Sequence, residues 1–347
     1  DRRGGLRARR PAARARARDQ PALAADLPGG DRRGVSPRTP VPQGAGSGTR
    51  GAWFPRWFWP AFATPAGLWL LGLFVLPFYV IVSIAFGDLD PIFLTPSPVY
   101  NPLRWDATAF TRLVGDLTTS GSIYQAAFVR TLLYVVVATA ACLAIGYPVA
   151  YFIARHAGRW RTVFLVLFIA PFWISYMMRM LAWINLLRPE GLVNRGLDAL
   201  GLIDAPVSWL SGRPVTVILG LTYGYIPYMI LPLFGSLDRI DRGTLEASRD
   251  LGAGQLSTFL RVTLPLSRQA ILAGIVIVTL PMFGDYFTQT LLAGTRNTSM
   301  IGNLIVSSVQ SSLVQTGASL VLILLILLIA PMLYYLRTTA RAAQVGR

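Results

Sequence analysis

Residues 246–253 read Glu-Ala-Ser-Arg-Asp-Leu-Gly-Ala, and residues 259–265 read Phe-Leu-Arg-Val-Thr-Leu-Pro. This short polar stretch lies between two apolar runs, at about 214–237 and 269–292. Each run is long enough to cross about 30 Å of hydrocarbon as a helix. A polar connection between two such helices must lie at the membrane face, because its groups need water or protein partners. The stretch therefore indicates a helical membrane protein with a structured loop.

The local pattern predicts how this loop folds. Thr244 is a suitable N-cap, which places Glu246 in the first turn, where a negative charge favours the helix dipole. Gly252 predicts a helix end in a left-handed backbone conformation, and Pro265 predicts the end of the stretch that follows. We expect a short helix, a sharp turn and a second helix lying across the membrane face, over about residues 242–265.

The composition supports a membrane protein over other classes. Of the 347 residues, 53% are hydrophobic and only 14% are charged, with a mean hydropathy of +0.50, whereas soluble domains carry roughly 25% charge. The net charge is +16, and all 32 basic residues are Arg. Residues 1–50 hold 12 of these arginines with 4 Asp, so the excess charge favours a membrane surface over nucleic acid. This segment has almost no large apolar side chains, and we expect a disordered cytoplasmic tail.

The rest of the chain predicts an all-α membrane protein with six transmembrane helices. The spans are expected at about residues 66–86, 131–154, 162–187, 214–237, 269–292 and 316–336. Residues 51–65 are rich in Trp and Phe, which is typical of a segment at the membrane interface. Residues 337–347 are expected to be a second cytoplasmic tail.

Arginines in the connecting loops predict the orientation. With the basic tail inside, the loops on that side carry eleven arginines, against seven on the other side, whose longer loops also hold Asp88, Asp90, Asp106 and Asp116. Both termini are therefore expected in the cytoplasm. The segment around Glu246 then faces the cytoplasm, where ATP is.

The pattern Glu-Ala-Ser-x-x-x-Gly in the loop, followed by an apolar residue and Leu-Pro, resembles the coupling loop of ABC-importer permeases. Ser248 replaces the usual second Ala. Further segments resemble the spermidine/putrescine type of this family, and the likeness extends over about residues 66–336. These segments are residues 143–155, 169–175 with Arg179, 280–287, 291–294 and 301–303.

The resemblance implies a type I importer permease core, formed by the last five spans, in a bacterial cell membrane. It implies two ATPase subunits that bind ATP and Mg, a second related permease chain and an extracytoplasmic substrate-binding protein. It implies no cofactor on this chain and no enzymatic activity. The substrate is expected to be a polyamine, with iron, thiamine or sulfate as alternatives. The residues expected to contact the ATPase are Glu246, Ala247, Ser248, Arg249, Asp250, Leu251, Gly252 and Ala253.

The substrate pathway is predicted around Asp285 in the fifth span. A carboxylate at the centre of a span costs about 2.5–3.5 kcal/mol on insertion scales, so it should face a partner or a water-filled path. Alternatively, Asp285 lies near the outer end of the span and is hydrated or paired with Arg179. Tyr286 is a further candidate, because an aromatic ring beside the carboxylate can bind an ammonium group. Tyr223, Trp173 and Arg179 complete the set of candidate pathway residues. For Tyr223 and Trp173, packing is the competing interpretation. The spacing of Gly220 and Gly224 is typical of close helix packing.

Two other classes compete with the importer hypothesis. A membrane-embedded hydrolase is disfavoured because the only histidine is His156, in a basic loop. An ion-coupled secondary transporter would be expected to show internal repeats and several intramembrane polar residues. The chain has no Lys and hence no P-loop, so ATP would have to be bound by another subunit. Cys142 lies within an apolar run and is expected to pack there or face lipid.

Overall fold

The computed structural model describes residues 57–89 and 96–345. The chain divides into two compact units, residues 1–63 and 64–347. The first unit is described only at residues 57–63, where α1 begins. The predicted disordered tail, residues 1–50, lies outside the described residues.

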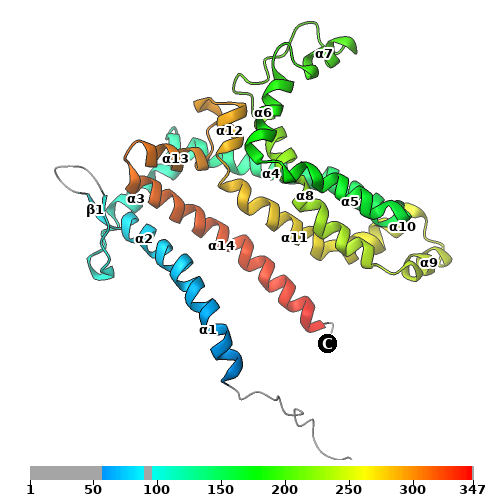
Figure 1. Ribbon diagram of the computed structural model, residues 1–347, viewed down its shortest axis with the longest axis horizontal. Coiled ribbons are helices and arrows are strands. Elements are labelled where there is room, and N and C mark those ends of the chain that lie inside the picture. Colours follow the sequence, from blue (N-terminus) through cyan, green and yellow to red (C-terminus); the bar gives the residue numbers. More distant parts are fainter. Residues whose placement is uncertain (1–56, 90–95, 346–347) are drawn as a thin grey trace, which may run out of the picture. The chain divides into compact units, whose positions relative to one another are not determined.

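Within the described residues the fold is almost entirely helical (Figure 1). The first half contains α1 (Phe58–Leu70), a π-helical turn (Leu71–Val75), α2 (Leu76–Ala85), β1 (Asp88–Leu89), β2 (Pro96–Ser97), a 3₁₀ turn (Pro102–Arg104), α3 (Thr108–Thr118), α4 (Ile123–Arg155), a 3₁₀ turn (Gly158–Trp160), α5 (Arg161–Ile169), a 3₁₀ turn (Ala170–Trp173), α6 (Tyr176–Leu187) and α7 (Leu192–Ala199). The two short strands pair antiparallel, with Asp88 opposite Ser97.

The second half contains α8 (Pro214–Arg239), α9 (Arg242–Asp250), α10 (Gln255–Thr258), a π-helical turn (Phe259–Thr263), α11 (Leu264–Phe283), α12 (Phe287–Leu292), a 3₁₀ turn (Arg296–Thr298), α13 (Ile301–Gln310) and α14 (Val314–Val345). The core of the second unit lies where α4, α8 and α11 pack together. Small side chains such as Ala138, Cys142 and Ala150 let α4 approach α8 closely. Cys142 is fully buried there and donates to the carbonyl oxygen of Thr222.

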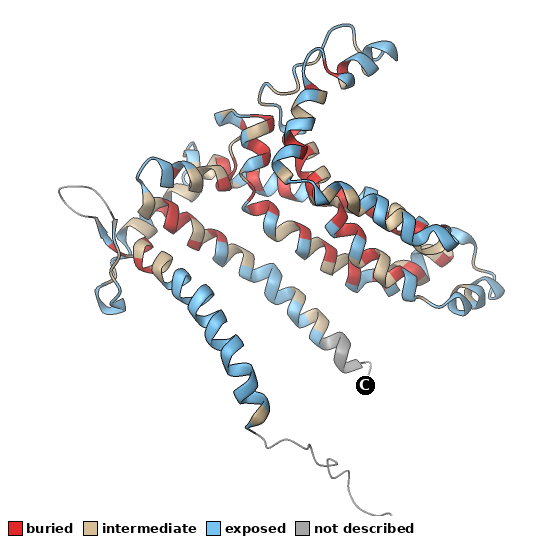
Figure 2. Ribbon diagram, in the orientation of Figure 1, coloured by how far each residue is buried: buried red, intermediate tan, exposed pale blue. Residues whose placement is uncertain are grey.

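Within residues 57–89 and 96–345, five helical stretches are long and apolar enough to cross a membrane. A sixth candidate is the pair 158–173 and 176–199, whose axes meet at 91°. The prediction of six spans therefore holds if this bent pair counts as one span. Along residues 64–79 every side chain is exposed, and most of them are apolar, as a lipid-facing surface requires (Figure 2).

Several predicted boundaries are wrong. The first span begins at Phe58 rather than 66, because the aromatic residues predicted to lie at an interface continue the helix. Residues 51–56 lie outside the described residues. The fifth span ends at Phe283 rather than 292, since the backbone turns at Gly284. The last helix continues to Val345, so the predicted tail 337–347 is helical as far as it is described. Its Ala, Arg and Gln residues are good helix formers.

Candidate functional site

The predicted coupling helix is present as α9, but it begins earlier than expected. Asp241 has an extended backbone and occupies the N-cap position, so the helix starts at Arg242. Thr244 is therefore the third helical residue and not the N-cap, and Glu246 lies beyond the first turn. The prediction was wrong because the helical backbone extends back to Arg242, although the side chain of Asp241 makes no capping hydrogen bond.

The end of α9 confirms the prediction for Gly252, whose φ angle is +83°. The amide of Gly252 donates to the carbonyl oxygen of Arg249 at 2.8 Å, and the amide of Ala253 donates to that of Ser248 at 3.1 Å. This pair of bonds is a Schellman motif, which satisfies carbonyls that the helix end leaves free. The left-handed residue reverses the chain, so α10 begins three residues later, at Gln255.

Pro265 does not end the stretch that follows, contrary to prediction. A π-helical turn covers Phe259–Thr263, and the amide of Leu264 donates to the carbonyl oxygen of Phe259, five residues earlier. Proline normally breaks a helix because it lacks an amide hydrogen and its ring clashes with an earlier carbonyl group. The wider turn before Pro265 relieves that crowding, so the helix continues into the fifth span.

The surface of the coupling segment is open and partly apolar. Its exposed members are Glu246, Ala247, Arg249, Asp250, Leu251 and Gly252. The side chain of Leu251 is 89% exposed, and that of Leu256 is 69% exposed. Ser248 faces inward instead, and its hydroxyl lies 3.0 Å from that of Thr258 at the end of α10. Ser248 therefore links the two short helices, while its neighbours in the segment are exposed.

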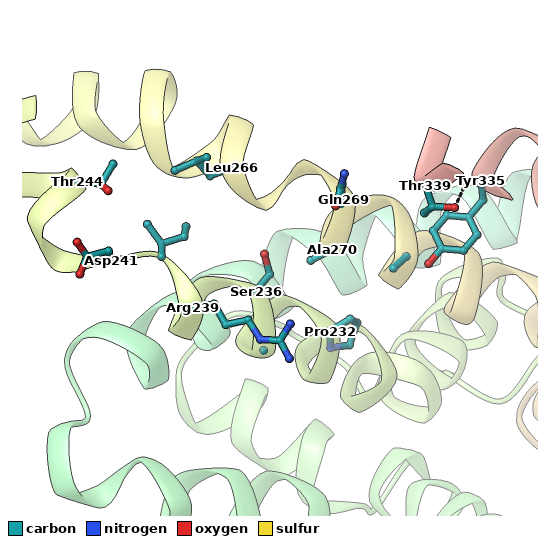
Figure 3. Close-up of a pocket in the computed structure, with 13 residues that line it drawn as sticks. Pro232, Ser236, Arg239, Asp241, Thr244, Leu266, Gln269, Ala270, Tyr335 and Thr339 are labelled. Carbon is teal, nitrogen blue, oxygen red and sulfur yellow. Dashed lines mark hydrogen bonds between the residues drawn. The ribbon is translucent and has the colours of Figure 1, made fainter. Parts of the chain in front are cut away.

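A cavity of about 700 Å³ lies behind this segment (Figure 3). Asp241 and Thr244 line it on the coupling side, and Tyr335 and Thr339 line it on α14. Ser236 and Arg239 of α8 and Gln269 of α11 add polar groups.

Asp285 lies in the break between α11 and α12 and is only 7% exposed. Its carboxylate accepts hydrogen bonds from the backbone amide and hydroxyl of Thr288, both at 2.9 Å. The hydroxyls of Tyr225 and Tyr176 donate to Oδ2 at 3.0 and 3.2 Å. Tyr176 also contacts the Thr288 hydroxyl. These four groups, which we call the Asp285 network, join α6, α8 and α12 through one buried carboxylate.

Two glycines on α8 allow the helices to meet at this point. A Cβ atom on Gly224 would lie 2.9 Å from the ring of Tyr176. A Cβ atom on Gly220 would lie 2.4 Å from Leu292 and 2.6 Å from Thr288, both on α12. The predicted close packing at this pair of glycines is confirmed. Without it, Tyr176 and Thr288 would be pushed away from Asp285.

Arg179, on the next turn of α6, is 9% exposed and lies among aromatic rings. Its guanidinium carbon is 4.3 Å from the ring centroid of Phe172, 5.2 Å from that of Tyr176 and 6.0 Å from that of Tyr223. Its Nε and Nη1 atoms are buried without a hydrogen-bond partner. Among the described residues it forms no ion pair with a carboxylate, so the alternative pairing with Asp285 is absent. Tyr176 lies between them instead, because its hydroxyl donates to Asp285 and its ring lies against Arg179.

The other predicted pathway residues lie in different surroundings. Tyr223 packs edge-on against Trp183 and belongs to the aromatic group around Arg179. Trp173 is 80% exposed, so its ring is not part of the buried network. Tyr286 stacks on Phe287 at 4.2 Å. Its side chain lines a separate cavity of about 320 Å³, with Thr290, Asn303, Ser307 and Gln310 among the lining residues.

The sequence analysis did not identify Tyr176, Tyr225 and Thr288 as partners of Asp285. The sequence did indicate that Asp285 has such partners, because a buried carboxylate needs hydrogen-bond donors. The chain has 13 tyrosines, however, and the choice among them depends on the bend between α5 and α6. Groups of three or more His, Cys, Asp or Glu that could hold a metal are absent from the part of the chain that the structure describes.

Comparison with known proteins found a matching family model and similar sequences. The family model for binding-protein-dependent transport system inner membrane components matches residues 143–339. The spermidine/putrescine transport system permease protein PotB of Escherichia coli K12 is 34% identical over 237 residues, which are 68% of this chain and 81% of that protein. PotB of Haemophilus influenzae is 31% identical over 242 residues, 69% of this chain and 79% of that protein.

Two further matches are weaker, one because it covers less of the chain and one because its sequence identity is low. The inner membrane ABC transporter permease protein YdcU of E. coli K12 is 31% identical over 189 residues, 51% of this chain and 60% of that protein. Among solved structures, one chain of a bacterial alginate ABC transporter, in complex with an alginate pentasaccharide-bound periplasmic protein, has a TM-score of 0.65. The match covers 82% of this chain and 95% of that chain at 17% identity, which shows the fold alone.

Proposed function

This chain belongs to the family of binding-protein-dependent transport system inner membrane components, and on that premise we propose that it forms the gated pathway of an ATP-driven polyamine importer. It is a multi-pass inner-membrane permease, a transmembrane subunit without catalytic activity of its own. The proposed assembly contains two ATPase subunits, a second related permease and an extracytoplasmic binding protein. The ATPase subunits would hold ATP and Mg.

The coupling role is proposed for residues 246–253. Leu251 and Leu256 expose apolar side chains at a polar loop, and such exposure is typical of a surface that a partner covers. Glu246, Arg249 and Asp250 add charged groups beside them. In the proposed orientation α9 faces the cytoplasm together with both termini. Closure of the ATPase subunits would push α9 and, through the continuous helix that follows α10, move the fifth span.

One observation supports the polyamine proposal, namely that the Asp285 carboxylate is buried without a cationic partner among the described residues. Its side-chain partners are hydroxyl groups from three helices. An ammonium group can replace a hydroxyl donor and neutralise the charge at the same time, so an arriving cation gains a charge-assisted bond. Tyr176 and Tyr225 would then swing aside as the substrate passes.

The test is the uptake of radiolabelled spermidine by vesicles that contain the complete transporter. Asp285→Asn keeps the size and one acceptor oxygen of the side chain but removes its charge. We expect the KM for spermidine to rise about tenfold, a loss near 1.4 kcal/mol. Asp204→Asn is the matched control, since Asp204 is exposed in the α7–α8 connection. Unchanged uptake kinetics for Asp285→Asn, at equal protein levels, would reject a role for Asp285 in the pathway.

A further inference from the structure

A basic cleft of about 470 Å³ lies at the same end of the helices as the coupling segment. It is formed by the end of α4, the turn between α4 and α5, and the connection from α8 to α9. We call it the arginine cleft, and its charged residues are Arg155, Arg161, Arg239, Arg242, Asp238 and Asp241. The cleft therefore presents four guanidinium groups and two carboxylates.

Four guanidinium groups against two carboxylates leave the cleft with a formal charge of +2. Arg161 pairs with Asp238 at 3.2 Å, but these side chains are 56% and 35% exposed, and such surface pairs contribute little. In the described part of the chain, Arg155, Arg239 and Arg242 form no ion pair. Arg155 donates from Nη2 to the carbonyl oxygen of Ile240 at 2.9 Å, while its Nε is buried without a partner. Arg155 thus has a buried donor atom without an acceptor.

The surroundings of the cleft place it at the edge of the hydrocarbon layer. Arg155 ends α4 directly after the apolar run 131–154. Trp160, in the turn beside it, is 54% exposed, with the guanidinium of Arg159 5.5 Å from its ring centroid. Exposed Trp next to Arg is typical of the headgroup level of a bilayer. Val163 and Leu167, which follow on α5, are also exposed and fit the adjoining acyl chains.

We propose that the arginine cleft binds the phosphate group of an anionic phospholipid. Arg is suited to this because its planar group donates two parallel hydrogen bonds to phosphate oxygens. Basic pockets between membrane helices are known to hold anionic headgroups. The competing explanation is that arginines simply gather in the loops on one side of a membrane protein. That tendency explains their number, but it explains neither the cavity nor the buried Nε atom of Arg155 without an acceptor.

The proposed lipid would also contact the coupling region. A smaller cavity of about 190 Å³ shares Arg155 and Arg242 with the cleft and is lined by Glu246 and Arg249 of α9. A bound phosphate would therefore neutralise charge beside the helix that is proposed to contact the ATPase. The assignment of the lipid site itself does not depend on the transport proposal, because lipid binding can be measured without transport.

The experiment is native mass spectrometry of the complete transporter, taken from nanodiscs that contain equal amounts of phosphatidylglycerol and phosphatidylcholine. We expect wild type to retain phosphatidylglycerol preferentially, and Arg155→Gln with Arg242→Gln to reduce that preference on the order of tenfold. Arg155→Lys with Arg242→Lys should keep only part of it, because the charge remains but the paired hydrogen bonds to phosphate are lost. Arg188→Gln with Arg195→Gln is the control, since both residues are exposed on the connection that contains α7.

Equal retention of the two lipids by wild type, or an unchanged preference in the Gln variant, would overturn the proposal. A second arm adds inorganic phosphate to transporter in nanodiscs made only of phosphatidylcholine. Phosphate bound there, with no preference for phosphatidylglycerol in the first arm, would assign the cleft to a soluble anion and also overturn the lipid assignment. Melting temperatures of all variants distinguish loss of binding from loss of folding.

Discussion

Asp285 is the residue on which the pathway proposal depends. It lies just after the end of α11, and its Oδ1 accepts a hydrogen bond from the backbone amide of Thr288 in the first turn of α12. Its Oδ2 accepts from the hydroxyls of Tyr176, Tyr225 and Thr288. One oxygen can therefore keep α12 in place while the other exchanges partners.

Gly224 tests whether the geometry of this network matters for transport. In Gly224→Ala the new methyl group meets the Tyr176 ring at 2.9 Å, and this aromatic ring must shift. We expect spermidine uptake to fall about tenfold or more, with a loss of stability of about 1–3 kcal/mol from overpacking. The readouts are initial uptake rates and thermal unfolding of the purified transporter.

The control for this prediction lies on the same helix. Gly235 of α8 has no atom within 4 Å of the position of an added Cβ. Gly235→Ala should leave both uptake and unfolding temperature close to wild type. If Gly224→Ala behaves like Gly235→Ala, the contact between α6 and α8 at Tyr176 is not required.

At the scale of elements, the unit that we propose to transmit motion consists of α9, its left-handed end at Gly252 and the helix that follows. The Schellman bonds fix the turn at Gly252, and the π-helical turn lets Phe259–Thr263 continue into α11 without a break. The loop is therefore mechanically joined to a membrane span, and we expect a disturbance at Gly252 to affect transport rather than insertion.

Gly252→Pro is the corresponding variant. Proline fixes φ near −65° and has no amide hydrogen, whereas Gly252 has a φ of +83° and donates to Arg249. We expect normal membrane insertion, loss of ATP-driven uptake, and weaker recovery of the ATPase subunits in affinity purification. Gly254→Ala, at an open position with a φ of −66°, should behave as wild type. Wild-type uptake by Gly252→Pro at equal membrane levels would refute the coupling role.

At the scale of the whole molecule, the sequence predicted the features that depend on neighbouring residues and missed those that depend on tertiary packing. Apolar length predicted the helical membrane fold, and the loop pattern predicted a short helix ending at Gly252, because both depend on neighbouring residues. The third span was predicted as continuous, yet it turns by 91° after Trp173. Pro171 favours a break in the helix here, but the size of the angle depends on tertiary packing, which neighbouring residues do not predict.

The candidate sites were predictable to different degrees for the same reason. Asp285 was identified because a carboxylate in an apolar run is conspicuous. Its partners Tyr176 and Tyr225 come from helices 109 and 60 residues away in the chain, so only the packed structure selects them. Trp173 and Arg179 are six residues apart, but the bend after Trp173 exposes the first and buries the second.

The most direct test of the importer account measures uptake by proteoliposomes that contain this chain with its ATPase subunits, partner permease and binding protein. Spermidine, putrescine, thiamine, iron and sulfate are offered separately, with and without internal ATP, to wild type and to Glu246→Ala. We predict ATP-dependent accumulation of spermidine or putrescine that Glu246→Ala abolishes. ATP-driven uptake of a different solute alone would keep the importer and discard the polyamine. Uptake of every solute without dependence on ATP would contradict the account.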